Sequence, residues 1–135
     1  MRVKLILSFA ALLFTLPLLF TGCDDTITNN DIENLVFPDK DVSFSKHVFP
    51  VFQGRCAFSG CHGNIAPANG LDLTTHSGVT FDQLIVFPGS ARDSRLAWAI
   101  DGTGPILMPP NGFRGLSKNQ IDGIKRWIDE GAKNN

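Results

Sequence analysis

The feature that most constrains this chain is a short run of two cysteines and a histidine. Four residues separate Cys56 from Cys61, and His62 follows the second cysteine directly. A Cys-x-x-Cys-His run is typical of covalent haem attachment, in which both thiols form thioethers to the porphyrin and the histidine binds the iron. Because Cys61 and His62 are adjacent, a thioether at Cys61 brings the imidazole to the iron.

The gap of four residues is longer than the usual two. Cys56 has only to reach the second vinyl group of the ring, and Gly60 allows the longer loop to bulge. The run therefore predicts haem attachment at Cys56 and Cys61, with His62 as one axial ligand. The unusual spacing bears on the Cys56 thioether and not on the one at Cys61.

Two other kinds of site use the same side chains. Cys56 and Cys61 could form a small-loop disulfide in an envelope lipoprotein of binding or structural role, since such compartments are oxidising. A zinc site could combine the three residues of the run with His47 or His76. Adjacent side chains converge poorly on one small tetrahedral ion, however, and a disulfide leaves the histidine beside Cys61 unexplained.

Several further motifs surround the run. They are Phe-Pro-Val-Phe at 49–52, Gly-Leu-Asp-Leu at 70–73, Pro-Gly at 88–89 with Ser94 and Leu96, Met-Pro-Pro at 108–110, and Trp-Ile-x-x-Gly-Ala at 127–132. With the cysteines they resemble, in type and order, the small monohaem cytochrome c domains of bacterial envelope proteins over about residues 42–132. The resemblance implies an all-α, small cytochrome c-like fold of about four short helices, with long Gly- and Pro-rich loops around one haem c.

Met108 is the candidate for the second axial ligand of the iron. The only other methionine is Met1, and prolines at 105, 109 and 110 stiffen the loop around Met108. A thioether is a soft, neutral donor that favours ferrous iron, and the Met-Pro-Pro motif of the family implies the same role. The alternatives are that Met108 fills the core, or that His47 or His76 is the ligand, although no motif supports either histidine.

Arg92, Arg95 and Trp98 lie on or near a predicted helix that precedes the Met108 loop. Guanidinium groups and an indole N–H suit carboxylates, so these side chains are candidates for contacts with the haem propionates. The alternative is that both arginines belong to a solvated helix face.

The first 22 residues have the composition of an export signal. Arg2 and Lys4 supply a positive start, an apolar run extends over residues 5–20, and small residues precede Cys23. The apolar run is about sixteen residues long, shorter than the roughly 20 of a spanning helix, and an uncleaved anchor is the alternative. Residues 19–23 also resemble a bacterial lipobox, which implies that Cys23 becomes the lipidated first residue of the mature protein.

The sequence therefore divides into three parts. Residues 1–22 are predicted to be a lipoprotein-type signal peptide, 23–40 a lipidated tether and 41–135 the cytochrome c domain. Loss of Arg2 and Lys4 with the signal leaves 10 of the 12 basic side chains against 13 acidic ones, a net charge near −3. The sequence has no block of basic residues, so it does not favour a nucleic-acid partner.

Capping signals and apolar spacing predict four helices. They run from between 45 and 48 to 55, from 80 to 86, from 90 or 93 to 100, and from 117 to 131. Leu96, Ala99 and Ile100 are expected to face inward. Gly123 costs about 1 kcal/mol relative to Ala inside the last helix, which indicates a close approach by another helix. The resemblance implies that the helix before Cys56 is the one that crosses there.

These features predict a one-electron carrier and not an enzyme. His62 and Met108 would fill both axial positions, which leaves no open site for a small-molecule substrate. The expected partners are redox proteins of the cell envelope and, through the anchor at Cys23, membrane lipid on the periplasmic side. Because so small a domain has a limited apolar core, the protein without haem is expected to be loose or unfolded.

Overall fold

The computed structural model describes residues 27–135 of the chain. The predicted signal peptide and the lipidation site at Cys23 lie outside the described residues. Over residues 27–135 the chain forms five α-helices and no strand, so the predicted all-α class is confirmed. No helix in this part of the chain is both long and apolar enough to cross a membrane.

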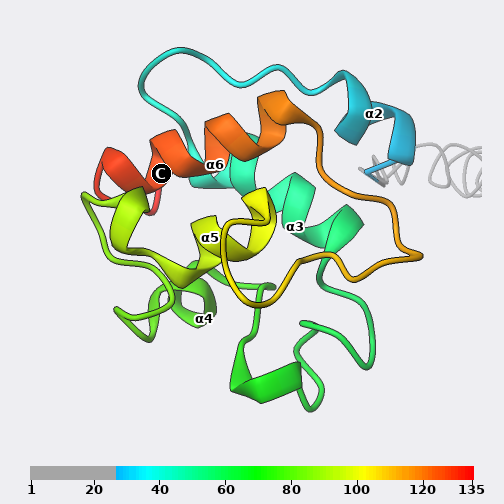
Figure 1. Cartoon of the computed structure of the whole chain (residues 1–135). Coiled ribbons are helices and arrows are strands. Elements are labelled where there is room, and N and C mark those ends of the chain that lie inside the picture. The colour runs from blue at the N-terminus through cyan, green and yellow to red at the C-terminus, as the bar shows by residue number, and fades with distance from the viewer. Residues whose placement is uncertain (1–26) are drawn as a thin grey trace, which may run out of the picture.

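The helices are short and are joined by long loops (Figure 1). In chain order they are α2 (Asn29–Asn34), the π-helical turn η2 (Phe44–Val48), α3 (Phe49–Arg55), α4 (His76–Thr80), α5 (Arg95–Asp101) and α6 (Lys118–Asp129), with 3-10 turns η3 (Ala68–Gly70) and η4 (Ala91–Asp93). The last helix, α6, packs against α5 and η2, whereas α2 packs against α3. The segments α3, η2, α6 and α5 therefore pack one against the next, with α2 beside α3. The long loops after α3 and α5 extend from these helices.

The helix α2 forms within the predicted tether and raises the number of α-helices above the expected four. Thr28 and Asp31 make a capping box, in which the Thr28 N–H donates to Asp31 Oδ2 at 2.9 Å. Ile32 is 2% exposed and packs where Gly54 of α3 has no side chain: a Cβ at Gly54 would lie 1.8 Å from Ile32 Cδ1. Phe37 is also buried. Apolar side chains of the predicted tether thus pack on the domain, because they find partners in the core.

The helix predicted to end at Arg55 is confirmed, and it consists of η2 followed by α3. Ser43 caps η2, since its hydroxyl accepts from the Lys46 N–H at 3.2 Å. Pro50 lies in the first turn of α3, directly after the π-helical turn η2. Because α3 ends at Arg55, Cys56 is the first residue of the loop that follows.

The final helix α6 also agrees with its sequence prediction. Ser117 and Gln120 form the predicted capping box, with each side chain accepting from the backbone N–H of the other residue. Ile124, Trp127 and Ile128 form its fully buried stripe. Local capping and apolar period therefore sufficed to place this helix.

The close approach at Gly123 exists, but its partner differs from the prediction. The ring of Phe37 lies over Gly123, and a Cβ at Gly123 would stand 2.0 Å from Phe37 Cδ1. Phe37 follows α2 in a loop, so a side chain and not a helix backbone occupies the space. The turn η2 does pack against α6, as the resemblance implies for the helix before Cys56.

The helix predicted to follow Thr80 is wrong. Instead the helix α4 precedes this residue and ends at it. Thr75 caps α4, since its hydroxyl accepts from a backbone N–H of the first turn at 3.0 Å. After α4 the Asp82 carboxylate accepts from the Leu84 N–H at 2.8 Å. Such a local turn offers the backbone an alternative to helix, which explains why the chain does not continue helically towards residue 86.

The helix α5 begins within its predicted range and ends at Asp101, one residue beyond it. Gly102 follows, as predicted, and its φ of 74° is the left-handed conformation that favours glycine. Leu96 and Ile100 are buried, as predicted, but Ala97 and not Ala99 is the fully buried alanine. Ala99 instead lines a cavity beside the helix.

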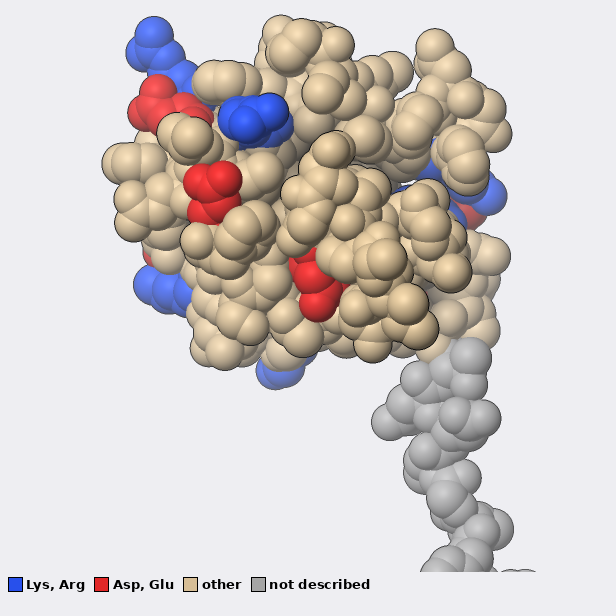
Figure 2. Space-filling view, turned by 90° about the horizontal axis from the view of Figure 1, so that it is seen from below, with Lys and Arg blue, Asp and Glu red and all other residues tan. Residues whose placement is uncertain are grey.

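Charged side chains are scattered over the surface. Seen from below in Figure 2, isolated basic and acidic groups are separated by broad uncharged areas. The face in this view has no continuous patch of one sign. This distribution agrees with the small formal net charge of −1 for the whole chain.

Candidate functional site

A cavity of about 560 Å³ opens between α3, α5 and the two long loops. Cys56, Cys61, His62 and Met108 all line it. The cavity therefore brings together the four predicted haem residues of the described chain, although Met108 is distant from the other three in sequence. Its volume lies within the range of about 300–1,000 Å³ that is usual for small-molecule and cofactor sites.

Large apolar side chains form much of the cavity wall. Phe58, Phe81, Trp98, Ile106 and Phe113 line the cavity and are between 38% and 62% exposed. Aromatic and aliphatic groups of this size usually have apolar neighbours, so the wall offers a surface for a large apolar ligand. The sequence prediction missed Phe58, Phe81, Ile106 and Phe113, because loop residues show no periodic pattern. It had named Trp98, which lies on α5, only as a candidate for contacts with the propionates.

Cys56 lies at the end of α3, where its N–H donates to the Phe52 carbonyl at 2.9 Å. Burial raises the pKa of its thiol to about 12, although the nearby Arg55 charge lowers it and Cys61 raises it further. The thiol is therefore protonated at neutral pH and is a poor nucleophile for disulfide exchange. In the structure both Cys56 and Cys61 are free thiols.

The four residues between the cysteines form a compact double turn. The Cys61 N–H donates to the Phe58 carbonyl at 3.0 Å, and the His62 N–H donates back to the Cys56 carbonyl at 3.1 Å. Gly60 has a φ of 79°, which the turn requires. The turn closes the longer gap, so both cysteines still face one cavity.

His62 is oriented by a backbone carbonyl. Its Nδ1 lies 3.1 Å from the Leu71 oxygen, and the Leu73 N–H donates to the His62 carbonyl at 2.9 Å. A proton on Nδ1 donated to Leu71 leaves Nε2 unprotonated, which is the form that binds a metal. The sequence does not indicate this contact, because every residue has a carbonyl.

Met108 is held on the side of the cavity formed by α5. Its N–H donates to the Ala99 carbonyl at 2.9 Å. At the start of the same loop, Asp101 Oδ1 accepts from the Thr103 N–H at 3.0 Å and hydroxyl at 2.6 Å, and Asp101 Oδ2 accepts from Lys125 Nζ at 2.7 Å. Burial would raise the pKa of Asp101, but these hydrogen bonds outweigh it and lower the pKa.

The competing histidines do not line the cavity. His47 Nδ1 accepts from the Ser43 N–H at 3.0 Å. His76 Nε2 lies 2.7 Å from the Ala132 oxygen, and its ring packs edge-on against Phe44. Within residues 27–135 no three His, Cys, Asp or Glu side chains are grouped to hold a metal ion.

The three candidates for contacts with the propionates separate in the structure. Arg95 and Trp98 line the cavity, whereas Arg92 does not. The Trp98 indole N–H is already used, because it donates to the Arg92 carbonyl at 2.7 Å. Of the three, Arg95 is therefore the charged side chain that lines the cavity.

Comparisons of the chain with protein-family models, with curated proteins and with solved structures find no match.

Proposed function

We propose that this chain is an electron-transfer protein that carries one covalently bound c-type haem in a small cytochrome c-like fold. The observation that supports this function is a single cavity lined by Cys56, Cys61, His62 and Met108. Two thiols, an imidazole and a thioether are the donors that a haem with His and Met ligation needs. The apolar walls of the cavity suit the porphyrin.

Each residue has a separate task in this proposal. Cys56 and Cys61 attach the ring, and His62 binds the iron through Nε2 while its Nδ1 bonds to the Leu71 oxygen. Met108 supplies the second axial donor. The haem itself supplies one-electron cycling of its iron between the ferrous and ferric states. With two protein ligands and no open position, the protein is proposed to be an electron carrier and not an enzyme.

The proposed setting is the periplasmic side of the cell envelope, with Cys23 as the lipid anchor and envelope redox proteins as partners. The support is the sequence alone: an export-type leader and a lipobox-like ending at Cys23. A mature charge near −3 would steer the domain towards basic surfaces and would act on the rate of encounter.

The test is expression of the full chain with a cytochrome c maturation system. We expect visible haem absorbance that stays with the polypeptide through denaturation and acid–acetone extraction. Each single variant is expected to keep one thioether. In Cys61→Ser the ring is no longer attached beside His62, whereas in Cys56→Ser it still is. A colourless parent protein with one disulfide would instead support the envelope lipoprotein without haem.

A further inference from the structure

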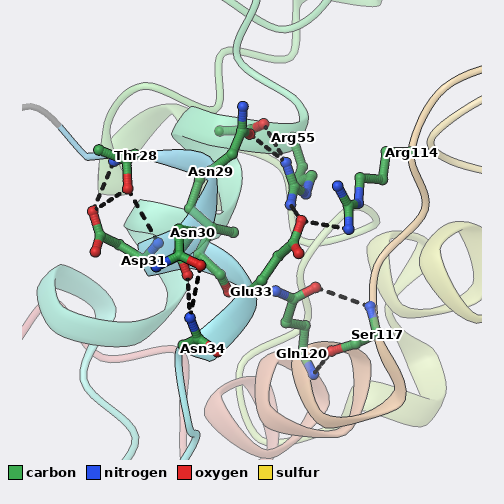
Figure 3. Close-up of polar contacts among 12 residues, drawn as sticks. Thr28, Asn29, Asn30, Asp31, Glu33, Asn34, Arg55, Arg114, Ser117 and Gln120 are labelled. Carbon is green, nitrogen blue, oxygen red and sulfur yellow. Dashed lines mark hydrogen bonds and ion pairs between the residues drawn. The ribbon is translucent and has the colours of Figure 1, made fainter.

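Glu33 of α2 binds two arginines that come from different segments of the chain (Figure 3). Its Oε1 lies 3.0 Å from Arg55 Nη2 and 2.5 Å from Arg114 Nη2. Arg55 ends α3 and directly precedes Cys56, whereas Arg114 lies on the loop that carries Met108. One carboxylate therefore joins the two walls that hold the proposed haem residues.

The Arg55 end of this bridge is buried. Its side chain is 6% exposed, and its Nη1 donates to Asn29 Oδ1 at 2.8 Å, so two side chains of α2 satisfy the guanidinium. A buried charge is stable only when it is paired and hydrogen-bonded. Arg55 therefore fixes the position of Glu33, and Glu33 presents its carboxylate to the Met108 loop.

The helix α2 is anchored independently of Arg114. Gln120 Nε2 donates to the Ile32 carbonyl at 2.8 Å, and Asn119 Nδ2 donates to the Leu35 carbonyl at 2.9 Å. Both donors lie in the first turn of α6, immediately after the loop that carries Arg114. The helix therefore lies where the Met108 loop runs into α6, as Figure 1 shows.

We propose that α2 braces the cavity and that Glu33 is a positioning residue for Met108. The inference rests on the proposed haem function. The start of the loop is held by Asp101 and by the bond between Met108 and Ala99, whereas Glu33 holds its far end through Arg114. Loss of the Glu33–Arg114 pair frees that end, and the bond between Met108 and Ala99 then breaks more often. The loop then opens more often, and Met108 leaves the iron more often.

The experiment uses the matured full chain and the variant Arg114→Gln. Arg114 is 67% exposed in its side chain, so the variant removes the pair without disturbing the core. In the ferric protein, imidazole can replace Met108 only when the loop opens, and we expect its capture to be about two- to fivefold faster, as the loss of one exposed pair predicts. The matched control is Lys118→Gln, which removes the cation of the exposed Lys118–Asp122 pair on α6 and should leave capture unchanged.

Two further measurements separate positioning from general stability. Hydrogen exchange of the Met108 amide should accelerate in Arg114→Gln, whereas exchange of the Leu73 amide, bonded to the His62 carbonyl, should not. The free energy of unfolding of Arg114→Gln should fall by no more than the loss of one exposed pair that the faster imidazole capture reports. Glu33→Gln should show a larger increase in imidazole capture together with a lower denaturant midpoint, because it also leaves Arg55 unpaired.

The failure of the brace and the failure of the haem proposal have different signatures. If the parent protein lacks covalent haem, the proposed function is overturned and the role of Glu33 with it. If the parent holds haem with Met108 bound, but imidazole capture and Met108 exchange are the same in Arg114→Gln, Glu33→Gln and Lys118→Gln, only the brace is overturned.

Discussion

At the scale of single residues, the two proposed iron ligands owe their positions to backbone carbonyls. His62 bonds to the Leu71 oxygen through Nδ1, and Met108 donates its N–H to the Ala99 carbonyl. The first contact sets which nitrogen of the imidazole is free, and the second places the thioether over the cavity beside α5. Both contacts depend on loop conformation, so neither could be inferred from residue types.

Substitution of Met108 tests the axial assignment directly. In Met108→Ala we expect the reduction potential to fall by on the order of 100 mV, a part of the roughly 0.8 V that axial ligands span, because a donor that favours ferrous iron is lost. Voltammetry and the spin state of the ferric protein measure the change. The control is Leu107→Ala, whose side chain is 48% exposed and does not line the cavity. An unchanged potential in Met108→Ala would exclude this residue as the ligand.

At the scale of elements, helices with strong local signals agree with the sequence and weaker ones do not. The Ser117–Gln120 capping box of α6 is present as predicted. Thr80 precedes Gln83 with the same spacing, yet its hydroxyl donates to the His76 carbonyl at 2.9 Å and ends α4. The same motif thus has opposite outcomes, because after Thr80 the Asp82 side chain holds a local turn, whereas after Ser117 an apolar stripe continues along the helix.

The close packing of Phe37 against Gly123 predicts that a side chain at this position lowers the stability of the protein. In Gly123→Ala the new methyl group meets the Phe37 ring, and we expect the free energy of unfolding to fall by about 1–3 kcal/mol, despite the better helix propensity of alanine. Denaturant titration of the haem protein measures it. Gly115→Ala is the matched control, since nothing lies within 4 Å of a Cβ there, and a glycine-to-alanine change then has no steric cost. Equal stabilities for the two variants would refute the close contact.

The ion pair between α5 and α6 predicts a dependence of stability on pH. The pKa of Asp101 is lowered in the folded protein, so its contribution is complete above the ordinary carboxyl value of 3.8 and is lost as the pH falls through the folded pKa. Asp101→Asn should therefore reduce the free energy of unfolding at pH 7, by about 1 kcal/mol for a partly exposed pair. As the pH falls, the variant should lose less stability than the parent, because it has no Asp101 carboxylate to protonate. Stability curves of parent and variant that stay parallel from pH 7 to pH 2 would contradict this.

At the scale of the whole molecule, one buried apolar core lies beside a cavity of about 560 Å³. Buried side chains such as Val51, Ile124 and Trp127 join the helices on one side. On the other side the wall residues, among them Phe81 and Phe113, remain partly exposed along a cavity of about 560 Å³. A small domain with so much apolar surface unpaired depends on whatever fills the space.

The protein without haem is therefore expected to lack a cooperative native transition. Chain expressed without the maturation system should bind a hydrophobic dye and melt gradually in circular dichroism, whereas the haem protein should melt cooperatively. The comparison needs no variant, since both proteins have the same sequence. A sharp, two-state transition in the protein without haem would show that the helices and their core suffice for folding.

The resemblance to cytochrome c domains implied the all-α class and supported Met108 as a site residue. The amino-acid sequence by itself determined the helices at Arg55 and Ser117 and the grouping of Cys56, Cys61 and His62. These depend on neighbours in the chain: apolar period, capping pairs and the spacing of Cys56, Cys61 and His62. Only the tertiary structure decided that α2 belongs to the folded domain, that Phe37 covers Gly123, and that Glu33 joins Arg55 to Arg114. Those contacts link residues that are far apart in the chain. They are stabilised by burial and charge pairing, which depend on the folded arrangement and cannot be predicted from a local sequence pattern.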